Sequence, residues 1–306
     1  MASFFDEIAR NRLKSVILMC AFALLFFAFI YLIVFLLGGG PFGIFIGGLL
    51  IIAYAAFSYF YGSSMILKIS HAKEADPSKY PDLFGVVEGL SAAAQIKKPK
   101  VYVIQNPSPN AFATGRNRNN ASVAVTTGLL SMMDREELEG VLAHEISHIY
   151  NNDIQFMMLA IVFGGVIGIV AAFLRYSFFF GGIGGNRNGG GYILLIELVL
   201  AILAPLVALL LRLAISRRRE YMADANGARM TRDPVSLAEA LKKIKAFDSA
   251  PTKNQAQQVQ AAHVHSPDPV TASMYFSNPI HVSSISNLFS THPPIDERIK
   301  RLQNMH

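Results

Sequence analysis

The chain has 306 residues, of which 52% are hydrophobic and only 16% are charged. Because soluble globular domains carry about 25% charged residues, this composition indicates a protein that is partly embedded in a membrane, and it excludes global disorder. The single cysteine, Cys20, excludes an internal disulfide and a cysteine-based zinc cluster.

The chain begins with two long apolar stretches, 16–37 and 42–61, which contain no charged residue. A helix needs about 20 apolar residues to cross the hydrocarbon core of a bilayer. We therefore predict a transmembrane hairpin over residues 1–61. The first stretch is too long for the apolar core of a signal peptide, which has roughly 7–15 residues, and we expect a retained anchor.

A polar block follows over residues 62–155. Apolar residues at helical spacing predict a helix over 80–94, and residues rich in Val and Tyr predict strands over 100–104 and 122–125. Residues 111–114 are expected to form a short extended segment at the sheet edge.

The next predicted helix covers residues 135–150. Asp134 is its expected N-cap, with Glu137 three residues on as in a capping box. This helix contains His144-Glu145-Ile-Ser-His148, in which the two histidines stand at positions i and i+4. Such histidines share one helix face, so both can bind one zinc ion while the adjacent Glu145 acts as a general base. The alternative is a helix with two incidental histidines.

A second transmembrane hairpin is predicted over residues 156–211, from the apolar stretches 156–174 and 192–211. The alternative for all four stretches is a set of buried helices in a soluble core, but such helices rarely run this long without a polar face. Glu197 is the single charge in the fourth stretch, and either snorkelling to the membrane surface or pairing with Arg175 is its simplest explanation.

Basic residues flank the predicted spans mainly on one side, which predicts that both termini and both polar blocks are cytoplasmic. These residues are Arg10, Arg12, Lys14, Lys68, Lys73, Arg212, Arg217, Arg218 and Arg219. The net charge of +6 is therefore attributed to topology and lipid contact rather than to nucleic acid. We expect a multi-pass protein of the cell (inner) membrane with a cytoplasmic site.

The last block, 212–306, resumes with a helix after Arg217 that contains Glu220 and Asp224 on one face. Catalytic zinc needs a third protein ligand, and Glu220 is the candidate, with Asp224 placed to accept a hydrogen bond from a ligand histidine. Spacing alone also fits a solvated helix face. Counting residues from the spans places Glu220 at the height of the two histidines if the spans pack as a hairpin.

Another helix is predicted over 234–247, followed by a long loop over 249–290. Neither polar block looks complete alone, whereas their 189 residues together suffice for one core. We expect a single domain built from both.

Four stretches together resemble the HtpX-like membrane metalloproteases, which are related to the CAAX prenyl endoproteases. They are 144–148, 217–228, 110–115 and 291–298. The resemblance covers nearly the whole chain. It implies an α-helical membrane protein with four transmembrane helices and an α+β cytoplasmic protease domain of the zincin-like (gluzincin) type.

The resemblance also implies roles for single residues. His144, His148 and Glu220 would hold one zinc ion per chain, Glu145 would activate water, and Asp224 would hold a ligand histidine. A substrate-binding edge strand is implied for Asn110, Ala111, Phe112, Ala113, Thr114 and Gly115.

His292 and Arg298 match a late histidine and arginine of the family, and the resemblance implies that they lie near the site and stabilise the oxyanion. From the residues alone, a histidine before two prolines is also typical of a turn.

The predicted function is zinc-dependent cleavage of membrane or membrane-proximal proteins on the cytoplasmic side, and the resemblance implies a role in quality control of damaged membrane proteins. The expected partners are protein substrates and the lipid bilayer. Two alternatives remain: a zinc-stabilised membrane scaffold without turnover, and a small transporter or channel in which Glu197 is the functional group.

Overall fold

The computed structural model describes residues 31, 40–155, 158, 217–249 and 293–305. These residues belong to two compact units. The first contains residue 31 and 40–58, and the second contains the described residues from 59 onward. Helix α2 (Gly40–Ile69) contributes residues to both units.

One of the four predicted spans, 42–61, lies in the described part of the chain, within α2. No helix among the described residues is both long enough and apolar enough to cross a membrane. The spans 16–37, 156–174 and 192–211 lie outside the described residues, apart from Tyr31 and Met158. The four-span arrangement therefore stays a prediction.

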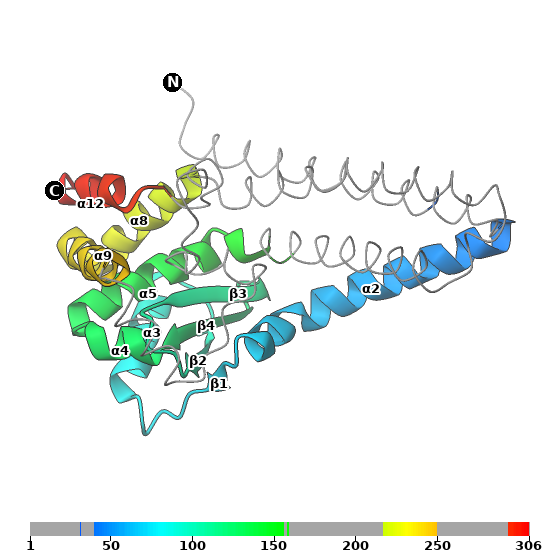
Figure 1. Ribbon diagram of the computed structural model, residues 1–306, viewed down its shortest axis with the longest axis horizontal. Helices are drawn as coiled ribbons and strands as arrows, with labels where there is room; N and C mark the ends of the chain where they lie inside the picture. Colours follow the sequence, from blue (N-terminus) through cyan, green and yellow to red (C-terminus); the bar gives the residue numbers. More distant parts are fainter. Residues whose placement is uncertain (1–30, 32–39, 156–157, 159–216, 250–292, 306) are drawn as a thin grey trace. The chain divides into compact units, whose positions relative to one another are not determined.

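The second unit contains a four-stranded sheet with the order β1-β2-β4-β3 (Figure 1). The strands are β1 (Lys73–Glu74), β2 (Lys100–Ile104), β3 (Ala111–Asn117) and β4 (Asn120–Thr126). β2 pairs with β4 in parallel, and β3 pairs with β4 in antiparallel orientation. The structure confirms the predicted strands and places β3 at the sheet edge.

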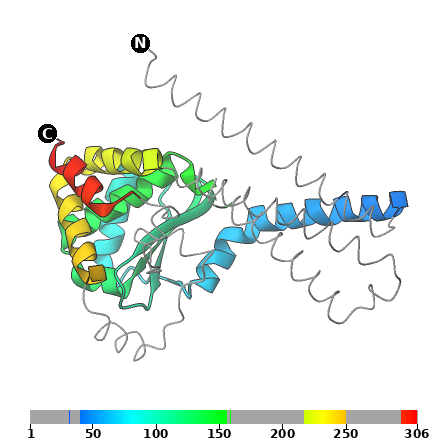
Figure 2. The same ribbon diagram turned by 45° about the horizontal axis from the view of Figure 1, so that its top comes forward.

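Helix α5 (Arg135–Tyr150) lies between the sheet and the helices α8 (Arg217–Thr231) and α9 (Pro234–Ser249) (Figures 1 and 2). It packs against β3 on one side and against α8 and α9 on the other, and α12 packs on α9 and α8. The helices that follow α2 are α3 (Pro81–Ala93), α4 (Thr127–Met132), α5 (Arg135–Tyr150), α8 (Arg217–Thr231), α9 (Pro234–Ser249) and α12 (Ile295–Gln303).

Strand side chains alternate between two apolar clusters, because successive residues of a strand point to opposite faces. Val101 and Val123 belong to the main core, which is shared with the helices. Phe112 and Ala124 face the other way, where they pack with the C-terminal end of α2 and with Met158. The sheet is thus buried on both faces, and β3 is fixed beside α5.

The start of α5 agrees with the predicted capping box. The Asp134 carboxylate accepts a hydrogen bond from the Glu137 backbone N–H at 2.9 Å, and the Glu137 carboxylate accepts one from the Asp134 N–H at 3.0 Å. These two bonds satisfy N–H groups that a helix start leaves without partners. They fix the register of the helix that carries both histidines.

Candidate metal centre

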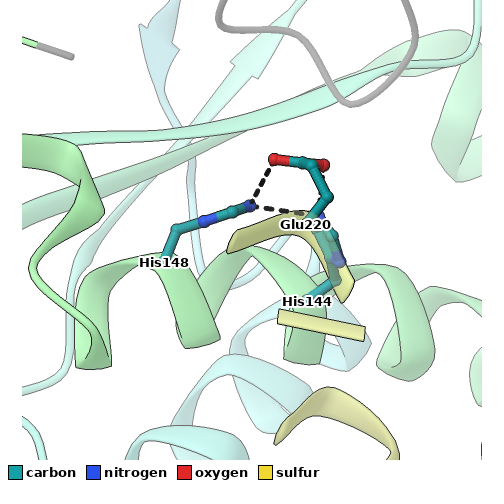
Figure 3. A group of neighbouring side chains, drawn as sticks. All are labelled: His144, His148 and Glu220. Atoms are coloured by element: carbon teal, nitrogen blue, oxygen red, sulfur yellow. Dashed lines mark hydrogen bonds and ion pairs between the residues drawn. The ribbon is translucent and has the colours of Figure 1, made fainter. Parts of the chain in front are cut away.

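Helix α5 carries His144 and His148 one turn apart, and α8 carries Glu220 opposite them (Figure 3). The two Nε2 atoms lie 3.1 Å apart. The Glu220 carboxylate places one oxygen 3.6 Å from each of these nitrogens. The three side chains point toward one another, and their ligand atoms lie within 4.8 Å of one another, so the group could hold a metal ion.

Glycine at position 227 lets α8 approach α5 closely. A Cβ built at Gly227 would lie 3.2 Å from the His144 backbone nitrogen, which is tighter than ordinary van der Waals contact. The same closeness brings Glu220, two turns earlier on α8, to the two histidines. Gly227 was not identified from the sequence, although a glycine within a helix is a signal of close packing.

Asp224 and Arg298 form a buried ion pair beside His144. Asp224 Oδ1 lies 2.9 Å from His144 Nδ1, and the guanidinium of Arg298 donates to both oxygens of Asp224 at 2.7 and 2.9 Å. Burial would raise the pKa of Asp224, but Arg298 and His144 hold that pKa well below its usual range. Asp224 is therefore ionised and accepts a hydrogen bond from Nδ1–H of His144, which leaves Nε2 with its lone pair.

Glu145 is buried between α5 and β3. Burial raises the pKa of its carboxyl above the ordinary value. The neighbouring imidazoles of His144 and His148 act in the opposite direction, as does a hydrogen bond from the backbone of Ala113. A raised pKa suits a carboxylate that must take up a proton near neutral pH.

His148 lies in an acidic environment. Burial would lower its pKa, but the carboxylates of Asp153, Glu220 and Glu145 raise the pKa of His148 to about 9. An environment that raises the pKa of an imidazole stabilises positive charge, whether a proton or a metal cation carries it.

β3 is an outer strand of the sheet, and its Ala113 backbone bonds Glu145 beside the cluster. The Thr126 N–H donates to the Asn110 carbonyl at 2.9 Å, so hydrogen-bonded pairs alternate along β3 from that point. The backbone groups of Ala111, Ala113 and Gly115 then point away from β4. No strand in the described part of the chain pairs with this side of β3.

The structure brings together the predicted residues His144, Glu145, His148, Glu220 and Asp224. Asn110 immediately precedes β3, and residues 111–115 belong to it. His292 lies outside the described residues. Asp153, which contacts His148 at 3.0 Å, was not identified from the sequence.

Arg298 lies near the cluster, and the role in stabilising an oxyanion that the resemblance implies for it stays a prediction. The side chain is 1% exposed, and its hydrogen bonds go to Asp224 on α8. Its guanidinium also lies 3.3 Å from His144 Nδ1.

Residues 77–306 match the family model described as Peptidase family M48. The chain belongs to this family. It is a metallopeptidase, and the resemblance to HtpX-like proteases is confirmed. A "Protease HtpX homolog" from Dictyoglomus thermophilum is 44% identical over 304 residues, which cover 99% of this chain and 95% of that protein. Another from Caldanaerobacter subterraneus subsp. tengcongensis is also 44% identical, covering 97% and 96%.

A crystal structure of S. mikatae Ste24p is similar to this one with a TM-score of 0.47 at 17% identity. The match covers 96% of this chain and 67% of that chain.

Proposed function

We propose that the chain is an integral-membrane zinc endopeptidase that cleaves membrane or membrane-proximal proteins on the cytoplasmic side. The observation that carries this proposal is the convergence of His144, His148 and Glu220 beside a buried Glu145. A purely structural metal site needs no general base, so the position of Glu145 favours an enzyme over a scaffold.

The donor set of the cluster fits zinc. Two imidazole Nε2 atoms and one carboxylate supply three protein ligands, which leaves a fourth position for water or substrate. Magnesium and calcium prefer sites made of oxygen ligands alone. A zinc ion held by these residues would polarise the scissile carbonyl and lower the pKa of water to about 7.

The chain's own residues carry the proton transfers in this proposal. Glu145 accepts the proton of the attacking water and delivers it to the leaving amine. Asp224 keeps His144 in the tautomer that offers Nε2, and Arg298 keeps Asp224 ionised. We therefore assign Arg298 to the support of Asp224, and we retain His292 as a candidate contact of the oxyanion.

A substrate chain would bind as an additional strand on β3. The Ala111 N–H donates to the side-chain oxygen of Asn110, and the Ala113 backbone bonds Glu145. An extended peptide would bond the remaining backbone groups that point away from β4, which gives affinity with little selectivity for side chains. The bond between Ala113 and Glu145 places this edge next to the proposed base. The scissile bond would thus lie between residues 110–115 and the metal.

The membrane location rests on the apolar sequence and on α2. Helix α2 exposes large apolar side chains along its length, among them Phe42, Phe45, Ile52 and Phe60. An apolar patch of this extent is unusual on a water-soluble surface, and lipid would cover it.

We propose the division into a hairpin (1–61), a first half-domain (62–155), a second hairpin (156–211) and a second half-domain (212–306). Substrates would then reach the site at the membrane surface. Quality control of damaged membrane proteins is the biological role we propose.

The test is a comparison of full-length protein in detergent with Glu145→Gln and with Glu136→Gln, a matched change at an exposed position of α5. Zinc content and cleavage of an unfolded membrane protein are measured. We expect about one zinc per chain in all three, and a loss of about 10²–10⁴-fold in rate for Glu145→Gln alone. Undiminished cleavage by Glu145→Gln refutes the assignment of the base. Absence of zinc from the wild type refutes the metal assignment.

A further inference from the structure

The two histidines of the cluster are held in the same way by different parts of the chain. His144 Nδ1 lies 2.9 Å from Asp224, which is bound by Arg298. His148 Nδ1 lies 3.0 Å from Asp153 Oδ2, and Arg219 Nη1 donates to Asp153 Oδ1 at 3.1 Å. In both cases the imidazole Nδ1 contacts a carboxylate, and that carboxylate in turn accepts a hydrogen bond from a guanidinium.

Asp153 reaches His148 only because α5 ends between them. In a continuous helix, a residue five positions on lies about 140° around the axis, which is the wrong face for contact. The helix ends at its C-cap Asn151, and Asn152 adopts a left-handed conformation with φ of 62°. This turn brings the carboxylate of Asp153 back toward the imidazole.

Asp153 is buried, with 5% of its surface exposed, and both of its oxygens have partners. Asp153 Oδ2 is placed to accept a hydrogen bond from Nδ1–H of His148, and the Nε2 atom of that imidazole faces Glu220 and His144.

Arg219 connects this contact to the third ligand, because it immediately precedes Glu220 on α8. The ion pair between Asp153 and Arg219 thus joins the end of α5 to the first turn of α8. The Asp153 carboxylate thereby contacts both the His148 imidazole and the residue that precedes Glu220 on α8.

We propose that Asp153 is a positioning residue of the metal site, which orients His148 through its Nδ1 and holds Glu220 in place through Arg219. This inference rests on the proposed function, since it assigns the support of the proposed zinc ligands. It predicts that Asp153 governs how tightly the site holds its metal.

The experiment uses the full-length chain in detergent, with Asp153→Asn, Asp153→Ala and Arg219→Ala. The matched controls are Asp233→Asn, which removes another carboxylate beside a helix start, and Arg218→Ala, which changes the exposed arginine next to Arg219. The zinc dissociation constant is measured by competition with a chromophoric chelator. The visible absorption spectrum of the cobalt-substituted protein reports the ligand geometry, and thermal unfolding of the metal-free protein reports the fold.

We expect Asp153→Ala to weaken zinc binding by about 10–100-fold, as loss of a carboxylate behind a metal-binding histidine does. Asp153→Asn keeps the side-chain volume and one acceptor oxygen, so this variant serves as the test if Asp153→Ala does not fold. Its loss of zinc affinity should be at the lower end of that range. Both variants shift the cobalt spectrum, Arg219→Ala weakens binding, and both controls bind zinc as the wild type does.

Wild-type zinc affinity and an unchanged cobalt spectrum in Asp153→Asn and Arg219→Ala would overturn the inference, even if metal-free stability falls, because Asp153 would then only join two helices. Equal weakening by Asp233→Asn would also overturn it. A wild type that binds no zinc overturns the proposed function instead, so the two failures are distinguishable.

Discussion

Replacing Arg298 with methionine tests whether this residue supports Asp224 or contacts the substrate. The change removes the guanidinium and leaves the Asp224 carboxylate buried, with 2% of its surface exposed. Breaking a buried ion pair by removing one partner lowers the free energy of unfolding by about 3–5 kcal/mol. For a domain of 150–250 residues, that loss corresponds to a fall in Tm of about 6–20 °C.

The assay is thermal unfolding of the metal-free, full-length protein, followed by circular dichroism at one scan rate. Arg301→Met is the matched control, because Arg301 lies on the same helix in an exposed ion pair with Glu297 at 2.9 Å. Such pairs contribute less than about 1 kcal/mol, so its Tm changes little. In a double-mutant cycle with Asp224→Asn, we expect the two losses to be less than additive by about 0.5–3 kcal/mol.

The opposite result is equally clear. A direct donor to the oxyanion contributes about 10²–10³-fold to kcat and little to folding. If Arg298→Met leaves Tm unchanged, lowers kcat by that factor and adds independently to Asp224→Asn, the reasoning from burial is refuted and Arg298 acts on the substrate.

Three further results are expected. Gly227→Ala should lower both Tm and zinc affinity, because its Cβ would lie 3.2 Å from the His144 backbone. Gly89→Ala is the control and should raise Tm, because a Cβ at that helical position meets nothing within 4 Å. Equal shifts in both variants would contradict the close packing of α8 on α5. Asp233→Ala should reduce stability by about 1 kcal/mol at pH 7. Hydrogen bonds from Ser236 and Val235 lower the pKa of Asp233 from 3.8, so its contribution is present above that pH and is lost as the pH falls through the lower folded value; denaturation of both proteins at several pH values checks this. Chelation should lower Tm, and zinc at 100 times its dissociation constant should restore about 2.7 kcal/mol, whereas calcium should restore none.

The sequence predicted elements whose information is local. Helix α5 was predicted with its correct bounds because its capping box and apolar spacing lie within the helix itself. β3 was recognised as an extended segment at the sheet edge. Helix α4 was not predicted, because its six residues, beginning Thr-Gly, are too few to show helical periodicity. Strand β1 was not predicted either, because it has only two residues.

Parts of the site that depend on distant pairing were harder to predict. Arg298 and Asp224 are 74 positions apart, so nothing in the sequence near either residue reveals their pairing. Asp153 is close in sequence to His148, but five positions along a continuous helix would place it on another face. Its contact with His148 depends on the left-handed conformation of Asn152, which the residue type alone does not reveal. The signal that could have suggested this turn is an asparagine just after a helix end, because asparagine often adopts the left-handed conformation there.

The cluster depends on the docking of three helices rather than on one motif. Asp224 on α8 holds a histidine of α5 and is itself held by Arg298 of α12. Because ligands that are correctly oriented only in the folded protein make metal binding a part of folding, any change that detaches α12 should weaken the site without touching a ligand. Ile299 and Leu302 bury the same helix in the main core. The C-terminal segment is therefore part of the metal centre in energetic terms, although it supplies none of the three proposed ligands.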